Sequence, residues 1–314
     1  MMKPPVSSYD PGLTQKFDET LRRAINKDGT FNVRRTGGGL HSLNFYQYLI
    51  SASWLKFLGI VLVAYVLLNA AFAELYLLAG IRHLQGADAR TPAIAFLSAF
   101  FFSVHTFTTV GYGSISPVGV WTNLISTVEA LTGLLSFGVA AGLMYGRFAR
   151  PSAKLAYSDR ALIAPYRGGT SLQFRVANLR NNLLMELEAS VMLMTVEKDG
   201  GRPRANYVPL NLERTKVLFF PLTWTIVHPI EEASPLYGRT PEDLKASKAE
   251  VIILVKGFDD TFSQVVHSRY SYRYDEIEWG AKFVPAFHID SNGDVVVQVD
   301  HISDIEKVEV PPVS

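Results

Sequence analysis

The chain has 314 residues, and its 30 lysines and arginines nearly balance its 29 aspartates and glutamates. This balance gives no overall electrostatic attraction to nucleic acid, so we expect no nucleic-acid partner. The length favours two domains. The sequence contains no cysteine, which excludes disulfide bonds, thiolate catalysis and cysteine-ligated metals.

Residues 1–39 are polar and contain no apolar segment of a signal peptide. We expect them to form a mobile N-terminal tail in the cytoplasm, ending at the three glycines 37–39. Residues 43–52 mix tyrosines and aliphatic side chains with polar ones, which predicts a short helix lying in the membrane interface. The alternative is that these residues form the first turns of the span that follows.

Two segments are long and apolar enough to cross about 30 Å of hydrocarbon. The first is expected over residues 54–79, with no charge between 57 and 73, and the second over 118–147, with no charge between 131 and 146. Two buried helices of a soluble protein are the alternative. With the N-terminus in the cytoplasm, two spans return the C-terminus to the same side. Basic residues flank the cytoplasmic ends, as the positive-inside rule requires: Arg34, Arg35, Lys56, Arg147, Arg150 and Lys154.

A third apolar segment lies between the two spans. Thr91 followed by Pro92 is a strong helix start, and it predicts a helix over residues 93–108. This helix is too short to cross the bilayer and return. A half-crossing helix followed by a loop fits better, and irregular backbone at membrane depth occurs only where it lines an aqueous cavity. The segment therefore indicates a pore.

The next five residues are Thr109-Val110-Gly111-Tyr112-Gly113. A potassium filter replaces the water shell of the ion with rings of oxygen atoms, and glycines let successive backbone carbonyls point toward one axis. We expect K⁺ to bind at Thr109, Val110, Gly111 and Tyr112, with the Thr109 hydroxyl adding a ring at the inner end and the side chains of Val110 and Tyr112 packing behind the filter. One such segment per chain requires four chains, so the sequence predicts a homotetramer whose only bound group is the permeant ion.

From Pro151 onward the pattern changes to short β-branched and aromatic segments separated by turn residues, which predicts a β-sandwich over residues 152–314. One helix interrupts the strands, with Thr240 as its N-cap and Pro241 after it. The expected strands include residues 172–179, 187–196, 217–227, 251–256 and 262–274. The predicted fold class is thus a two-span helical pore module over residues 40–151, joined to an all-β cytoplasmic domain.

The chain resembles the prokaryotic inward-rectifier potassium channels over roughly residues 40 to 290. Besides the filter, the matching segments are Arg147-Phe148-Ala149-Arg150-Pro151, residues 174–180, residues 225–230 with 234–237, and residues 276–280. The resemblance implies an immunoglobulin-like cytoplasmic domain, an interfacial slide helix and regulation by anionic lipid such as a phosphoinositide. It also implies a multi-pass protein of the bacterial inner membrane with both termini in the cytoplasm.

Several residues of the second span have candidate roles in the pore. The resemblance places Phe137 and Tyr145 at inward-facing positions, where the Tyr145 ring would close the path by excluding water; if the register is off by one residue, Tyr145 is an interface anchor. Gly138, Gly142 and Gly146 are spaced by four, which is typical of close helix packing, and a hinge is the alternative.

Glu129 is an ionisable group inside the second span, which indicates a functional role. We expect it to lie at filter depth and to support the filter through a hydrogen bond to Thr106 or Thr108. Arg147, Arg150 and Lys154 follow the second span, where they form either a solvated basic flank or a phosphate site for a lipid head group.

The resemblance fails at the positions that produce strong rectification. Strong rectifiers have an acidic residue where this chain has Phe137, and Lys256 stands where a further acid would be expected. Glu186 and Glu188 lie two residues apart, hence on one strand face, and would form either an acidic ring or an ordinary solvated face. We therefore expect weak block by polyamines.

The sequence predicts a potassium-selective channel of the inward-rectifier type, gated where the second spans cross and modulated by the cytoplasmic domain and by anionic lipid. The alternative is a non-conducting, membrane-anchored receptor that binds a partner through its β-domain. An enzyme is not expected, because the histidines and acids show no spacing typical of a nucleophile or a metal site.

Overall fold

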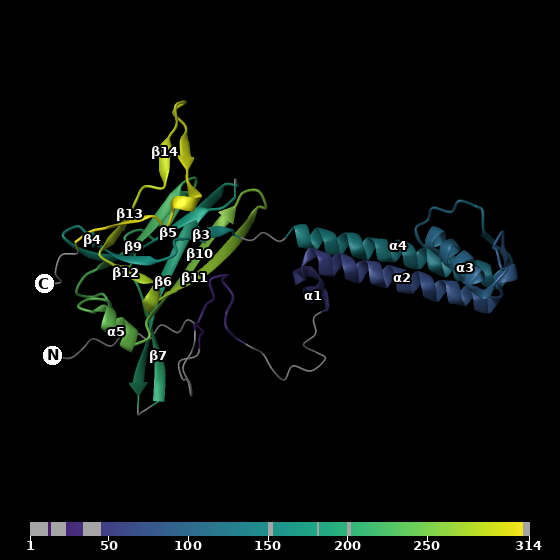
Figure 1. Ribbon diagram of the computed structural model, residues 1–314, viewed down its shortest axis with the longest axis horizontal. Coiled ribbons are helices and arrows are strands. Elements are labelled where there is room, and N and C mark those ends of the chain that lie inside the picture. Colours follow the sequence, from purple (N-terminus) through teal and green to yellow (C-terminus); the bar gives the residue numbers. More distant parts are fainter. Residues whose placement is uncertain are drawn as a thin grey trace. The chain divides into compact units, whose positions relative to one another are not determined.

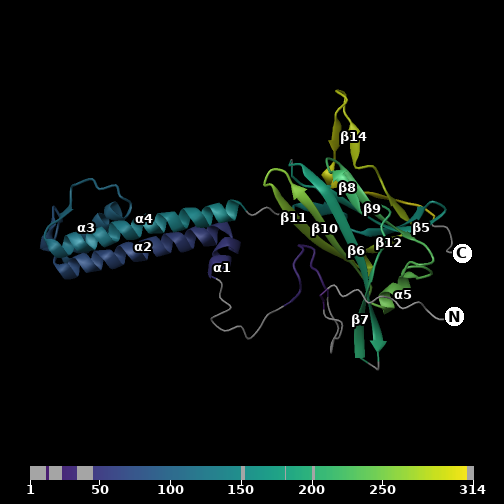
Figure 2. The ribbon, with the colours of Figure 1, turned by 180° about the vertical axis from the view of Figure 1, so that it is seen from behind.

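The computed structural model describes residues 12–13, 23–33, 45–149, 153–180, 182–199 and 202–309. The chain divides into two units, a helical one within residues 36–150 and a β-rich one formed by residues 1–35 and 151–314. Figure 1 shows both units, and Figure 2 shows them from behind.

The helical unit contains two long apolar helices and two short ones. The short helix α1 (Phe45–Ser51) precedes α2 (Trp54–Ala79), and α3 (Pro92–Phe107) precedes α4 (Val120–Phe148). Both α2 and α4 are long and apolar enough to cross a membrane. The second of these begins two residues later than expected, because Gly119 has φ +92°, a left-handed conformation that a right-handed helix does not contain.

The half-crossing helix α3 packs against both long helices near one end of the unit (Figure 1). The Thr91 side chain accepts a hydrogen bond from the Ile94 backbone N–H, so the predicted cap is confirmed. The loops on either side of α3 are joined by a pair of two-residue strands, β1 (Leu84–Gln85) and β2 (Ser116–Pro117). The apolar contacts between these elements involve Phe72, Ala73, Tyr76, Leu84, Ala99 and Phe102.

The β-rich unit is a sandwich of two five-stranded sheets. In one sheet the order is β11-β10-β6-β7, with β8 also on β6; in the other it is β12-β4-β5-β3, with β9 also on β5. Every pairing in them is antiparallel except β12 with β4. Alternate residues of both sheets meet in one apolar core, which includes Phe174, Ile226, Leu193, Ile253 and Tyr272.

The elements of this unit have the following bounds. The first sheet contains β6 (Leu184–Asp199), β7 (Arg202–Pro209), β8 (Lys216–Phe219), β10 (Glu250–Asp259) and β11 (Gln264–Arg273). The second contains β3 (Leu155–Tyr157), β4 (Ala161–Tyr166), β5 (Gly169–Asn178), β9 (Thr223–Ile230) and β12 (Ile277–Trp279). Two small pairs follow, β13 (Ala281–Phe283) with β16 (Ile305–Lys307) and β14 (Phe287–Ile289) with β15 (Val295–Val297). The helix α5 (Pro241–Ala246) has the predicted Thr240 cap, completed by Asp243 into a capping box.

The segment expected as one strand over residues 217–227 is two strands in different sheets. The first, β8, pairs with β6, whereas β9 pairs with β5. Pro221 lies between them, and a proline has no N–H with which to continue a ladder. The chain therefore crosses here from one layer of the sandwich to the other.

Residues 23–33, expected to be part of a mobile tail, pack on the sandwich instead. The Ile25 side chain is only 2% exposed and lies against Met194, Tyr207 and Ile252. The Glu250 carboxylate accepts hydrogen bonds from the backbone N–H groups of residues 24 and 25. An apolar side chain and paired backbone groups give this segment the contacts that a solvated tail lacks.

Candidate functional site

The segment that follows α3 has the backbone conformation of an ion filter. Thr109, Gly111 and Gly113 have φ values of +61°, +53° and +79°, so every second residue is left-handed. Alternation between right- and left-handed backbone turns successive peptide groups to one side, which is how a chain presents a row of like dipoles to an ion. Glycine adopts positive φ without strain, whereas Thr109 does so at a cost of roughly 1 kcal/mol or more.

The end of α3 holds this segment from behind. The backbone N–H groups of Val110 and Gly111 donate to the His105 carbonyl oxygen, at 2.9 and 3.2 Å. The Tyr112 ring makes an edge contact with the His105 ring, with centroids 4.8 Å apart. Within one chain Val110 and Tyr112 remain 52% and 75% exposed. The packing expected behind the filter is thus only partly supplied by the chain itself.

Glu129 is fully buried in the helical unit, but its partners differ from those expected. Its carboxylate accepts hydrogen bonds from the hydroxyls of Ser103 on α3 and Tyr76 on α2. The Thr108 hydroxyl instead donates to the Val104 carbonyl of its own helix. Helical geometry explains the difference. Ser103 lies one turn before Phe107 on the buried face of α3, whereas the Thr108 side chain is exposed.

Asn69 completes this cluster, and the sequence offered no partner for it. Its side-chain oxygen lies 3.0 Å from the Ser103 hydroxyl, and its amide nitrogen donates to the Tyr65 carbonyl at 2.8 Å. Polar side chains of α2 and α4 thus meet at one hydroxyl of α3, and Tyr76 of α2 joins them through Glu129. Such a network fixes the positions of its members when every member is paired.

Gly133 is a close-contact residue that the four-residue spacing missed. A Cβ atom built there would lie 2.1 Å from the Phe107 carbonyl oxygen, so only glycine lets α4 approach the end of α3. Gly138 and Gly142, by contrast, would place a Cβ at least 4 Å from every described atom outside their chain neighbours and the nearby backbone of their own helix. The sequence does show Gly133 as the first glycine of α4. It stands five residues before Gly138, however, so it falls outside the regular spacing of four.

The two expected pore-lining residues are exposed on α4. Phe137 and Tyr145 have 75% and 76% of their surface accessible within one chain. Gly146, next to the second of them, would place a Cβ 3.3 Å from Ile50 and 3.4 Å from the Tyr46 hydroxyl, so α1 packs directly on the end of α4.

The expected lipid-binding residues have different environments. The Arg147 guanidinium donates to the carbonyl oxygens of Leu49, Ile50 and Ala52. Lys154 is exposed and belongs to the β-rich unit, and Arg150 lies outside the described residues. The phosphate site expected from these three residues stays a prediction, while Arg147 itself donates to three backbone oxygens.

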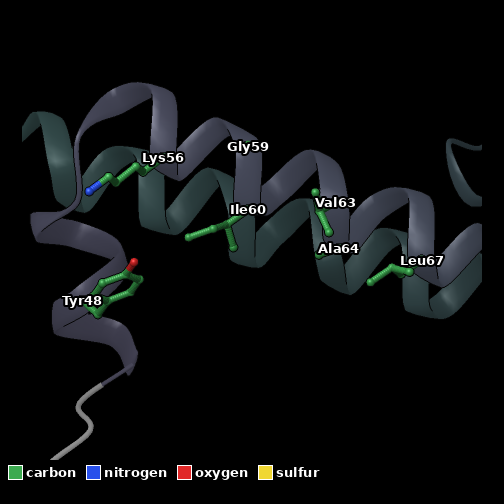
Figure 3. A pocket seen from close by; sticks show the side chains of 7 residues that line it. All are labelled: Tyr48, Lys56, Gly59, Ile60, Val63, Ala64 and Leu67. Carbon is green, nitrogen blue, oxygen red and sulfur yellow. The ribbon is translucent and has the colours of Figure 1, made fainter.

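An apolar groove runs along the outer side of α2 (Figure 3). Its volume is about 460 Å³, and Figure 3 shows Tyr48 of α1 and Lys56 near one end and Leu67 at the other. The floor between them is shaped by small and branched residues: Gly59, Ile60, Val63 and Ala64. A basic side chain at one end of an apolar groove complements the anionic head group and the acyl chain of a phospholipid.

Glu186 and Glu188, for which an acidic ring and an ordinary solvated face were the alternatives, lie at a β-bulge. Strand pairing shifts between Lys256 and Phe258, and Glu186 is left-handed with φ +51°, so it does not share the regular alternation that includes Glu188. Glu188 lies 3.1 Å from the Lys256 ammonium and 3.3 Å from that of Lys216. The Lys256 hydrogen bond, more than the second lysine, lowers the pKa of Glu188. Its charge is largely balanced.

A half-crossing helix, a filter segment with alternating backbone handedness and two flanking apolar helices together define a two-span cation channel of the membrane. Comparison with known proteins narrows this class. Residues 155–314 match the family described as "Inward rectifier potassium channel C-terminal domain", and residues 60–149 match the family described as "Ion channel".

Curated relatives agree with these matches. The chain is 38% identical to "Inward rectifier potassium channel Kirbac3.1" of Paramagnetospirillum magnetotacticum, over 84% of this chain and 89% of that protein. It is 28% identical to the human "ATP-sensitive inward rectifier potassium channel 15", over 98% of this chain and 88% of that protein. It is 26% identical to the bovine "ATP-sensitive inward rectifier potassium channel 12", over 86% of this chain and 68% of that protein. The chain belongs to the inward-rectifier potassium channel family, and it is a membrane channel rather than an enzyme.

Proposed function

We propose that four copies of this chain form a potassium-selective pore, gated at the ends of the α4 helices. The observation that carries the proposal is the left-handed conformation of Thr109, Gly111 and Gly113 directly after a half-crossing helix. A single row of carbonyls cannot surround an ion, whereas four rows around one axis supply complete oxygen rings. The filter side chains left exposed in one chain are then covered by neighbouring chains.

In this proposal K⁺ is the permeant ion, bound at Thr109, Val110, Gly111 and Tyr112, and no other cofactor takes part. The C-terminal end of α3 carries the negative end of the helix dipole and favours a cation beside it. Glu129, its hydroxyl partners Ser103 and Tyr76, and Asn69 beside Ser103 hold α2, α3 and α4 in register behind the filter. Phe137 and Tyr145 line the path on α4, where a ring of bulky side chains closes it by excluding water.

We further propose that an anionic lipid modulates the gate. The groove of Figure 3 supports this, because an acyl chain fits its apolar floor while Lys56 meets the phosphate. Lys56 therefore replaces Arg147 as the basic residue of this site, with Arg150 and Lys154 as further candidates. Lys56→Gln is expected to weaken the response to anionic lipid. Its matched control is Leu78→Gln, an uncharged substitution at an exposed residue at the other end of α2, which should leave that response unchanged.

The orientation follows from the same reasoning. Basic residues near the α1 end of the long helices support a cytoplasmic location for that end and for both termini. The bacterial inner membrane is the proposed location, by analogy with the bacterial relative.

The test is ion uptake by purified protein in liposomes loaded with potassium. Rubidium uptake that barium blocks and from which sodium is excluded would support the proposal, and the comparison with and without anionic phosphoinositide gives the sign of the lipid effect. Verified tetramers that take up no rubidium under any lipid condition would favour the receptor alternative. Equal passage of sodium and rubidium would show that the filter does not hold its selective conformation.

A further inference from the structure

Arg147 is the penultimate residue of α4 and lies two residues beyond Tyr145. Its Nη1 donates to the carbonyl oxygens of Leu49 and Ile50, and its Nη2 donates to that of Ala52 at 2.7 Å. The last carbonyls of a helix have no partner within the helix, and an arginine is a common way to satisfy them. The end of α1 is thus capped by a side chain from α4.

Two aromatic rings of α2 enclose the same guanidinium. Its central carbon lies 4.6 Å from the Trp54 ring centroid and 4.7 Å from that of Phe57. The Trp54 ring also packs on Phe148, with centroids 5.0 Å apart. A planar guanidinium combines stacking with several directed hydrogen bonds, which the point charge of a lysine cannot do.

We propose that Arg147 is a positioning residue that ties the interfacial helix α1 to the gate end of α4. The inference rests on the proposed gate at Tyr145 and assigns Arg147 a role other than lipid binding. Two carbonyls of α1, the carbonyl of Ala52 just beyond it, two rings of α2 and the last turn of α4 meet at this one side chain. A movement of α1 along the membrane surface is therefore transmitted to α4 beside the Tyr145 ring.

The two roles of Arg147 predict opposite results for Arg147→Lys. A lysine retains the positive charge and serves a phosphate well, so a lipid ligand would tolerate the change. A lysine has no planar guanidinium to stack on the Trp54 and Phe57 rings while it donates to the same carbonyls, so the tie would be lost. Trp54→Leu removes one of the rings and leaves the charge in place, which makes it an independent second variant.

The experiment uses full-length tetramers in liposomes of fixed anionic lipid content. For Arg147→Lys we expect amide hydrogen exchange in α1 to accelerate at least tenfold and rubidium uptake to fall at least threefold, with rubidium-to-sodium selectivity unchanged. Trp54→Leu should act in the same direction. The double variant should be no worse than the more affected single variant, because both changes break one unit. Lys245→Gln, which removes an exposed basic residue of α5 in the β-rich unit, should leave exchange in α1 unchanged.

Wild-type exchange and uptake in Arg147→Lys would overturn the inference, as would additive effects of the two substitutions. A loss of lipid response in Arg147→Gln that Arg147→Lys restores would show a lipid ligand instead. If wild-type tetramers conduct no rubidium, the proposed function fails, while the exchange measurement still decides whether Arg147 holds α1.

Discussion

Glu129 is buried in the helical unit and accepts hydrogen bonds from the hydroxyls of Tyr76 and Ser103, and the Ser103 hydroxyl also lies 3.0 Å from the Asn69 side-chain oxygen. Glu129→Ala would leave the hydroxyls of Tyr76 and Ser103 without this acceptor, at a cost of about 1–3 kcal/mol each. We expect the variant to form less stable tetramers with weaker potassium selectivity. Thermal dissociation of tetramers on gels and the rubidium-to-sodium uptake ratio measure both effects.

Glu129→Gln is the matched control, because an amide of the same shape still accepts one of these hydrogen bonds. It should lie between the wild type and Glu129→Ala. Equal stability and selectivity in all three proteins would show that the network does not support the filter.

Gly133 allows a second prediction at this scale. A Cβ at this position would overlap the Phe107 carbonyl, so Gly133→Ala must push α4 away from α3. Overpacking of this kind costs about 1–3 kcal/mol, and here it also displaces the end of α3 that carries the filter. The yield of tetramers and their thermal stability should fall, whereas Gly138→Ala, with free space around its Cβ in the described chain, should not disturb the contact.

His228 links the sandwich to pH. Its Nδ1 lies 2.6 Å from the Asn211 carbonyl, which can only accept, so Nδ1 carries the proton and Nε2 accepts from the Ser234 hydroxyl at 2.8 Å. Burial lowers the pKa of His228. The unfolded chain therefore takes up a proton near pH 6.5 that the folded chain resists, and stability falls as the pH drops below that value.

This loss amounts to at most about 1.4 kcal/mol between pH 6.5 and 5.5, the value of one pKa unit. Thermal unfolding of the full-length protein across this range should show it, and His228→Gln should remove that part of the pH dependence. An unchanged slope in the variant would contradict the assignment.

At the scale of elements, residues 23–33 behave as an arm docked on β10 and β11. Glu276 accepts hydrogen bonds from both Arg23 and the backbone of Arg273, and it pairs with Lys27 at 3.0 Å. Burial alone would raise the pKa of Glu276, but the hydrogen bonds from Arg273, Arg23 and Lys27 outweigh it and lower the pKa.

A carboxylate with a lowered pKa stabilises the docked arm fully above its ordinary pKa, and that contribution is lost as the pH falls through the lowered value. We expect amide exchange in residues 23–33 to accelerate below about pH 4.3, relative to the rest of the sandwich. Glu276→Gln should show the faster exchange already at pH 7. Protection that is equal in the variant and the wild type would mean that Ile25 alone holds the arm.

One local feature of the sandwich, a β-bulge, could not be predicted from the residue pattern, and its cause is steric. The bulge at Glu186 lies opposite Gly257, where a Cβ would come within 3.0 Å of the Leu187 side chain. A glycine inside a strand is a weak sign of a bulge, but it does not tell which partner strand carries the extra residue.

At the scale of the whole molecule, the two positions expected to control polyamine block carry no acid. Phe137 is apolar, and Lys256 is basic and pairs with Glu188. Spermine should therefore block outward current only weakly. Phe137→Asp places four carboxylates around the proposed pore and should raise the apparent affinity for spermine at least tenfold, whereas Phe137→Asn controls for the change of size. Strong block of the wild type in current recordings would contradict this account.

The sequence by itself determined the class of this protein, because the span lengths, the Thr91-Pro92 helix start and the Thr109–Gly113 segment depend on local chemistry and on the thickness of a bilayer. The two-layer β-domain was likewise predictable from short apolar strands and turns. Only the tertiary structure decided which side chains meet. Ser103, Tyr76 and Asn69 are separated from Glu129 by tens of residues, and Arg147 from the end of α1 by almost one hundred. Such contacts depend on the packing of whole helices, which no local spacing records.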